Sequence, residues 1–170
     1  TLRLLVTDAA ENQAEARVSV EVAARNYLAR LAATPSIFSP NADGRLETTS
    51  LEYELTSTAL VTLQVRDLGG GLVKTLEAGA SRDAGVYGFI WDGISDAGTP
   101  APDGDLRLHI RLEDPVGIGR PQDQSVALTV DRIAPALTLD RPQSGGFATR
   151  ATSVHGGVTD LHLAWYRIEA

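Results

Sequence analysis

The feature that most constrains the fold of this chain is a period-two alternation of apolar and polar residues. Successive side chains of a β-strand point to opposite faces, so this alternation predicts strands with one buried face. The alternating segments are residues 49–55, 59–65, 72–76, 87–91, 106–112 and 126–130. Turn-like sequences separate them at residues 68–71, 78–85, 92–105 and 114–124. No helical pattern of crossover length lies between these strands, so we expect an all-β, antiparallel sandwich.

Both ends of the chain also carry strand patterns. Residues 2–6 and 17–22 alternate on either side of a turn at 7–12, which predicts an N-terminal hairpin. An Ala-rich helix over 15–33, chiefly 23–33, is the alternative for this region, because Tyr27, Leu28 and Leu31 have helical spacing. Beyond Pro135, strand patterns recur at residues 137–139, 154–158 and 161–168.

Composition excludes several classes of function. The formal charge of the 170 residues is −7, and all of the net charge lies between Ser36 and Asp114. Bulk charge of this sign argues against non-specific binding to nucleic acid or to an anionic membrane. The chain has no cysteine, so it has no disulfides, thiolate metal sites or cysteine nucleophiles. No apolar run reaches the roughly 18 residues that a membrane span needs, so we expect no direct membrane insertion.

Four short motifs occur in order through the middle of the chain. They are F-S-P-N-A-D-G at residues 38–44, R-D-L-G-G at 66–70, W-D-G at 91–93 followed by D-A-G at 96–98, and P-D-G at 102–104. In this order they resemble bacterial immunoglobulin-like (Ig-like) modules related to the Ig-like domain of the flagellar hook-capping family. The resemblance extends from about Pro35 to Val130.

The resemblance implies a fold and a setting, and it has departures. It implies an immunoglobulin/fibronectin type III-like β-sandwich in an extracytoplasmic, multi-domain bacterial protein, without catalysis. Ala42 stands where the family often has Gly, Leu46-Glu47 where it has Asn-Asp, and Leu106 where a Tyr is usual. The first two departures weaken the case for a metal loop. Residues 156–160 and 165–169 look like the start of another such repeat.

The domain organisation follows from a weak internal repeat. Residues 2–22 and 108–130 both read as strand, Asp-containing turn and strand, and a proline-bearing junction follows each. We therefore expect partial sandwiches at both ends, with exposed apolar strand faces. The expected units are a hairpin closing an upstream Ig-like domain at residues 1–24, a linker at 25–34, a complete sandwich at 35–131, and the first strands of a downstream domain at 132–170.

The strongest candidate site is a calcium loop formed by Asn41, Asp43 and Glu47. Calcium binds about six to eight oxygens, often from alternate residues of a loop. Glu52 even has the EF-hand spacing from Asn41, but Arg45 stands where a ligand belongs and no helices flank the loop. The alternative is a turn in which the Asn and Asp side chains accept hydrogen bonds from nearby backbone N–H groups.

Other chemistry-bearing residues have structural explanations. Trp91 alternates with Tyr87 and Phe89, which predicts a core position rather than a sugar-binding platform. Residues 68–75 contain G-G-G-L-V-K-T, which lacks the context of a phosphate-binding loop and reads as a hairpin turn. Four loop aspartates are expected to cap turns, and three histidines lack paired metal-ligand spacing: Asp92, Asp96, Asp103, Asp105, His109, His155 and His162.

These observations favour a non-catalytic structural or spacer module of a large secreted or cell-surface bacterial protein, with calcium as a candidate stiffening ion. The alternatives are an adhesin or carbohydrate-binding ancillary module of a secreted enzyme, or a flagellar hook-assembly scaffold. The expected partners are neighbouring Ig-like domains of the same chain, together with an unidentified protein or glycan ligand. Fold analogy alone does not decide among these functions.

Overall fold

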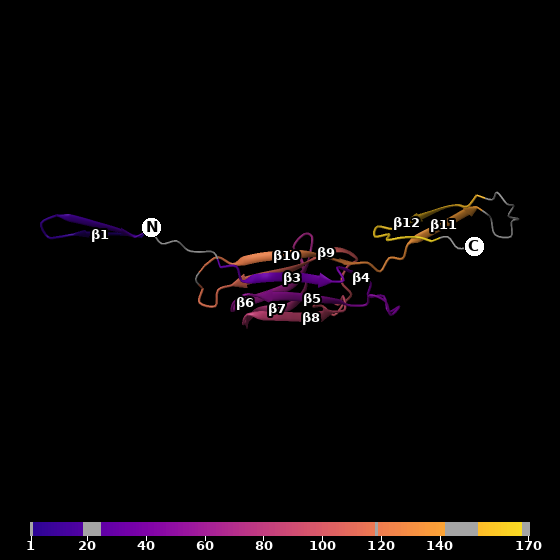
Figure 1. The fold of residues 1–170 in the computed structure, drawn as a ribbon, viewed down its shortest axis with the longest axis horizontal. Coiled ribbons are helices and arrows are strands. Elements are labelled where there is room, and N and C mark those ends of the chain that lie inside the picture. Colours follow the sequence, from indigo (N-terminus) through magenta and orange to yellow (C-terminus); the bar gives the residue numbers. More distant parts are fainter. Residues whose placement is uncertain (1, 19–24, 118, 142–152, 168–170) are drawn as a thin grey trace.

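A computed structural model describes residues 2–18, 25–117, 119–141 and 153–167 of the chain (Figure 1). Within these residues the regular secondary structure is all β, and no helix is long and apolar enough to cross a membrane. The strands are β1 (Leu2–Thr7), β2 (Gln13–Val18), β3 (Leu28–Thr34), β4 (Ile37–Phe38), β5 (Thr49–Leu55), β6 (Ala59–Asp67), β7 (Leu72–Arg82), β8 (Gly85–Trp91), β9 (Gly104–Glu113), β10 (Gln122–Val130), β11 (Ala136–Arg141) and β12 (His155–Thr159).

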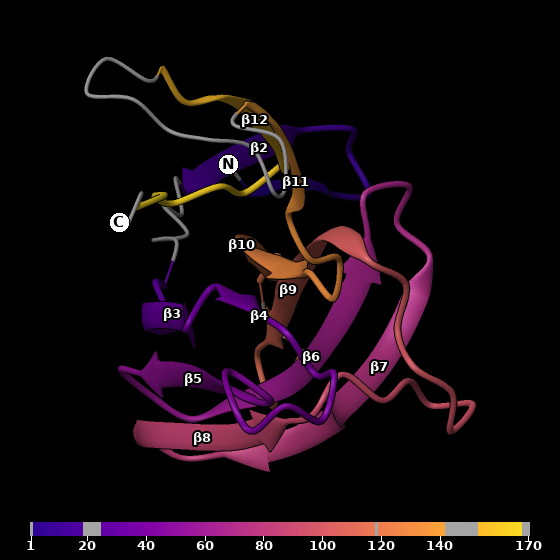
Figure 2. The same ribbon diagram turned by 90° about the vertical axis from the view of Figure 1, so that its right-hand side faces the viewer.

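Strands β3 to β10 form a sandwich of two sheets. The smaller sheet has the order β3-β5-β8, and the larger has the order β4-β10-β9-β6-β7. All neighbouring pairs are antiparallel except β4 and β10, which pair in parallel. Figure 2 looks along the long axis and shows the two sheets facing each other. The expected all-β, Ig-like sandwich is therefore confirmed.

The period-two pattern explains which side chains fill the space between the sheets. In β5, β6 and β9 every second residue is buried, and the residues between them are partly or fully exposed. Burial of these branched apolar side chains is the main term that stabilises the sandwich. The largest fully buried side chains are Trp91, Tyr53, Phe38, Leu51, Leu63, Leu108, Ile110, Leu112, Leu128, Val61, Val65 and Val130.

The segment before Pro35 belongs to the sandwich, which corrects the expected linker and also overturns the alternative of a helix. Residues 28–34 form strand β3 rather than a helix, and they pair with β5 rather than acting as a linker. The helical spacing of Leu28 and Leu31 is misleading because edge pairing with β5 satisfies the backbone of this Ala-rich segment. Tyr27 is buried beside β3, and its hydroxyl donates a 2.7 Å hydrogen bond to Asp114.

Strand β7 is longer than the alternation predicted. It extends through Arg82, so only the last part of the expected turn at residues 78–85 is a turn. Register shifts interrupt its pairing with β6, and bulges of this kind hide the period-two pattern. The N–H of Gly79 donates to Thr62 Oγ1 at 3.1 Å in this irregular stretch. Within residues 161–167, which the structure describes, the expected strand is not formed.

The two terminal hairpins form sheets of their own. β1 pairs only with β2, and β11 pairs only with β12. Leu4 is 63% exposed and Leu137 is 74% exposed, so the expected exposed apolar faces are present. The expected strand at 17–22 is described only as far as Val18, and the remainder lies outside the described residues. Which domains these hairpins belong to stays a prediction.

Candidate functional site

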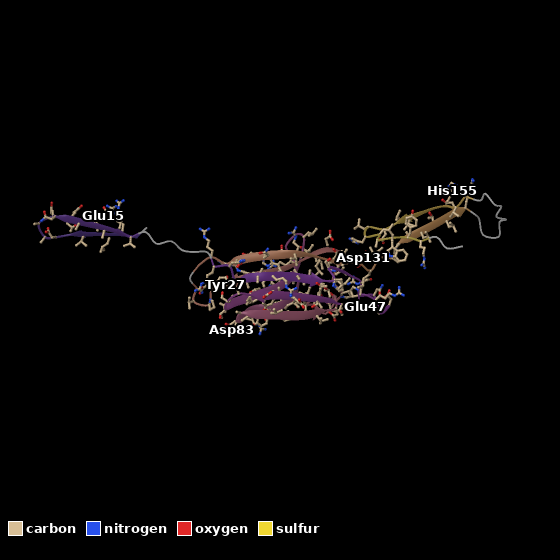
Figure 3. All side chains as sticks on the ribbon, viewed as in Figure 1. Glu15, Tyr27, Glu47, Asp83, Asp131 and His155 are labelled. Atoms are coloured by element: carbon tan, nitrogen blue, oxygen red, sulfur yellow. The ribbon has the colours of Figure 1, made fainter. Side chains whose placement is uncertain are left out.

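The candidate metal residues lie in the loop between β4 and β5, at the end of the sandwich where Glu47 is labelled in Figure 3. The carboxylate of Glu47 accepts hydrogen bonds from two backbone N–H groups, Ala42 at 3.0 Å and Gly44 at 2.8 Å. Both donors have positive φ, 67° at Ala42 and 81° at Gly44, which turns successive N–H groups towards one point. The loop thus forms a small concave cluster of donors that its own glutamate fills.

The other two candidate ligands are also occupied within the loop. Asn41 Oδ1 accepts the N–H of Asp43 at 3.0 Å, and Asp43 Oδ1 accepts the N–H of Arg45 at 2.8 Å. These are the side-chain-to-backbone bonds of consecutive Asx turns. The structure therefore brings Asn41, Asp43 and Glu47 together, but as acceptors for their own backbone.

A calcium ion in this loop would need those same oxygens. No group of three or more His, Asp or Glu residues among the described residues is arranged to hold a metal ion. Glu52, which the EF-hand spacing suggested, lies on β5 and forms an ion pair with Arg30 at 2.8 Å. Calcium binding stays a prediction, while the turn explanation accounts for each hydrogen bond that the loop makes.

The four aspartates at the junction of β8 and β9 each accept hydrogen bonds from different donors. Asp92 accepts the N–H of Ile94 at 3.1 Å, and Asp105 accepts the hydroxyl of Thr129 at 2.8 Å. Asp103 accepts the N–H of Arg132 at 2.9 Å. Each carboxylate thus has its own backbone or side-chain donor. Only Asp92 caps a local turn as expected, whereas Asp103 and Asp105 accept from residues that are distant in sequence.

Asp96 ties this loop to strand β7. Its carboxylate accepts the N–H of Thr75 at 2.8 Å and lies 3.4 Å from the ammonium of Lys74, while its own N–H donates to Val73 O at 3.0 Å. Partial burial alone would raise the pKa of Asp96, but the bonds from Thr75 and the Lys74 charge outweigh it and lower the pKa. The loop is therefore held best when this carboxylate is ionised.

Arg132, which the sequence patterns did not single out, fastens the loops at this end. Its guanidinium donates to Pro40 O at 3.2 Å and to Ala101 O at 3.0 Å, and it lies 3.2 Å from the carboxylate of Asp103. Close packing completes the contact, because a Cβ on Gly93 would lie 2.7 Å from Pro40 Cγ. An arginine directly after a strand gives no sequence signal for this role.

A second unforeseen cluster is a buried polar triad between the sheets. Glu77 is only 6% exposed, and its carboxylate accepts hydrogen bonds from the hydroxyl of Tyr53 and from Arg82 Nε, the latter at 2.6 Å. Arg82 also lies over the ring of Tyr87, 5.1 Å from its centroid. Burial, followed by the bond to Glu77, raises the pKa of the Tyr53 hydroxyl. The triad joins β5 to β7.

Three other features that the sequence singled out are Trp91, His109 and the glycine-rich segment at residues 68–71, and none of them forms part of a shared site. Trp91 is 2% exposed, and its indole N–H donates to Ile94 O at 2.9 Å, so it is a core residue. His109 lies on the outer face of β9, 3.4 Å from Asp123. Residues 68–71 form the turn between β6 and β7, as the N–H of Asp67 donates to Gly71 O at 2.9 Å.

This fold and these loops define an Ig-like β-sandwich module with self-capped loops. Residues 38–114, under half of the chain, match the model of the FlgD Ig-like domain. The match supports the flagellar hook-capping-like Ig module that the motifs predicted for this segment.

Two solved structures are similar to the chain, each with only modest likeness. FlgD from P. aeruginosa is 23% identical with a TM-score of 0.38, and the match covers 48% of this chain and 60% of that one. CopC from Methylosinus trichosporium OB3b is 16% identical with a TM-score of 0.36, and the match covers 62% of this chain and 92% of that one. No curated protein sequence matches the chain.

Proposed function

We propose that the sandwich is a non-catalytic structural spacer within a larger secreted or cell-surface bacterial protein. The observation that carries this proposal is that the polypeptide enters the sandwich at one end of strand β10 and leaves it at the other end. The backbone N–H of Tyr27, just before β3, donates to Oε1 of Gln122, the first residue of β10, at 3.0 Å. The chain leaves at the other end of β10, after Val130.

The distance between entry and exit is the length of one strand. β10 has nine residues, and from the first Cα to the last, at a rise of about 3.3 Å per residue, it spans roughly 26 Å. A module that receives the chain at one end of its strands and releases it at the other separates whatever is attached to each end. A sandwich with a closed core between the two ends suits such work.

Parallel pairing of β4 with the last strand of the sandwich, β10, gives this spacer resistance to tension. β4 pairs in parallel with the end of β10, and Thr129 N–H donates to Ser36 O at 2.8 Å. The N–H of Asp131 donates to Phe38 O at 3.0 Å. Pulling the two ends apart loads these bonds along the strand direction, so they must break together rather than one by one.

Single-molecule stretching of the whole chain tests the proposal. Because the chain has no cysteine, a pair introduced at exposed Asn26 and Ile133 provides handles on either side of the sandwich. A spacer should show one cooperative unfolding event under load. Gradual extension at low force, without a distinct event, would count against it. Calorimetric titration with calcium on the same chain decides whether the ion contributes.

Hook assembly is the second candidate function, and the match of residues 38–114 to the FlgD Ig-like domain supports it. Binding to flagellar hook protein, measured with the purified chain, would favour this function over a general spacer.

Carbohydrate binding is less well supported, because Trp91 of the sandwich is buried and offers no platform. A glycan array that is silent would agree with that.

A further inference from the structure

The outer face of the larger sheet carries two arginines, Arg66 and Arg107, without an ion-pair partner among the described residues. Because the apolar residues of β6 and β9 point inward, their alternate residues point outward. Arg66 of β6 and Arg107 of β9 are directly opposite each other in the antiparallel register. The next outward pair in the same register is Gln64 and His109.

The arginines on this face differ in their partners. Arg111 lies 3.0 Å from Glu113 and 3.2 Å from Asp123, so its charge is balanced. Arg66 has only neutral acceptors: Gln64 Oε1, 2.6 Å from Nη2 and 3.0 Å from Nε, and the Gly70 carbonyl at 2.8 Å. Exposed Arg107 makes no hydrogen bond or ion pair within the part of the chain that the structure describes.

This arrangement is unfavourable on its own and favourable around an anion. Like charges directly opposite each other on a sheet repel, and neither Arg66 nor Arg107 forms an ion pair with an acid among the described residues. Gln64 and Gly70 fix the orientation of the Arg66 guanidinium without using its charge. Guanidinium groups present paired N–H donors that match the two oxygens of a carboxylate.

A second unsatisfied group lies beside the pair. His109 Nδ1 is buried without a hydrogen-bond partner among the described residues, while Nε2 of the same ring lies 3.4 Å from Asp123. Buried polar atoms are usually satisfied, so an unpaired one calls for an explanation. This atom lies one residue pair away from Arg66 and Arg107 in the register of β6 and β9.

We propose that Arg66 and Arg107 form a docking site for a carboxylate that an acidic protein surface presents to this face of the sheet. The same face carries acids on both sides of the pair: Asp105, the next outward residue of β9, whose carboxylate accepts the Thr129 hydroxyl, and Glu113 and Asp123, which lie beside Arg111. A long polyanion such as a sulfated polysaccharide meets those acids and the −7 charge of the chain, whereas a single carboxylate reaches the two arginines alone. This contact is lateral and does not depend on the proposed spacer function.

The test follows the arginine side chains by NMR during titration of the whole chain with an acetylated tetraglutamate peptide. Saturable shifts of the Arg66 and Arg107 Nε–Hε signals are expected, and Arg107→Gln should weaken the binding at least about fivefold. Arg45→Gln is the matched control, because Arg45 is exposed and its side chain has no partner among the described residues. This control should bind like the unchanged chain.

Three outcomes would overturn the proposal. One is equal weakening by Arg107→Gln and Arg45→Gln, which would indicate non-specific charge attraction. Another is tighter binding of a sulfated polysaccharide than of the peptide. The last is a lower melting temperature of the free Arg107→Gln variant, because removal of unrelieved repulsion should leave that temperature unchanged or raise it. Since peptide binding is measured without load, its failure leaves the stretching result of the spacer unaffected.

Discussion

At the scale of single residues, the least expected feature is a carboxylate in the core. Glu77 is buried between the sheets and is satisfied by Tyr53 and Arg82. Removing one of its two donors is costly, because the buried Glu77 carboxylate then loses a hydrogen bond that water cannot readily replace. The triad therefore holds β5 and β7 at a defined spacing, in addition to the apolar packing around it.

Replacement of Tyr53 by Phe should destabilise the sandwich at neutral pH. The variant keeps the ring but removes the hydroxyl that donates to Glu77, and loss of a bond to a charged group costs about 1.5–3 kcal/mol. Urea unfolding measures this change in the free energy of unfolding. Tyr87→Phe is the control, since the Tyr87 hydroxyl donates to the exposed Asp83 carbonyl, and this change should cost less.

The same residue makes stability depend on alkaline pH. Because the folded state raises the pKa of Tyr53 above its ordinary value of 10.0, the folded state favours the neutral phenol. Its contribution is complete below pH 10 and is lost as the pH rises above that value. Unfolding free energies measured from pH 8 to pH 11 should fall more steeply for the unchanged chain than for Tyr53→Phe. Parallel curves would contradict this.

Glu47 offers a test that separates turn formation from metal binding. Glu47→Ala removes the acceptor of the Ala42 and Gly44 N–H groups, and the loop should lose about 1–2 kcal/mol of stability. If the residue only closes the turn, thermal unfolding will show the same loss with calcium and with a chelator. A calcium ligand would show the loss mainly when calcium is present. Glu54→Ala, a change of an outward residue on β5, is the control.

At the scale of elements, the alternation predicted the strands that have one buried face and missed those whose environment differs. β5, β6 and β9 were readable because burial there follows the period of two without interruption. β3 is an edge strand with a weak pattern, and β7 pairs through bulges that displace its register. The period-two pattern of apolar residues indicates which side chains are buried, but it does not indicate which strands pair through their backbones.

The loops were partly predictable, because some of their hydrogen bonds are local in sequence and others are not. The Asx bonds of Asn41 and Asp43 are local, so turn chemistry indicated them from the sequence. The partners of Glu77 and Arg132 are distant in sequence, and only the fold brings them together. An acid that accepts two N–H groups because of positive φ at Ala42 and Gly44 also could not be read from residue types alone.

The contact between the loop of Asp96 and strand β7 should weaken in acid. The lowered pKa of Asp96 means that ionised Asp96 contributes stability above its ordinary value of 3.8, and that this contribution is lost as the pH falls further, through the folded pKa. Hydrogen exchange of the Thr75 amide should accelerate in that range relative to other β7 amides. Asp96→Asn should remove this pH dependence. An unchanged profile in the variant would contradict the assignment.

At the scale of the whole molecule, the buried core belongs to one unit of eight strands. The residues of the core cluster extend from Tyr27 to Val130, and neither terminal hairpin contributes to it. The hairpins keep their apolar side chains exposed, as at Leu4 and Leu137. A link to the C-terminal hairpin is the contact between His162 Nδ1 and Asp131, at 2.8 Å, which is partly exposed.

The sandwich should therefore fold without either hairpin. A chain of residues 25–134 keeps Tyr27, the loops and Arg132, and it loses the partly exposed contact to His162, which is worth at most about 1 kcal/mol. For a domain of this size 1 kcal/mol corresponds to about 4–8 °C, so the melting temperature should fall by no more than that. Calorimetry of both chains measures it. A larger fall, or loss of cooperative unfolding, would show that the hairpins stabilise the sandwich through contacts beyond those described.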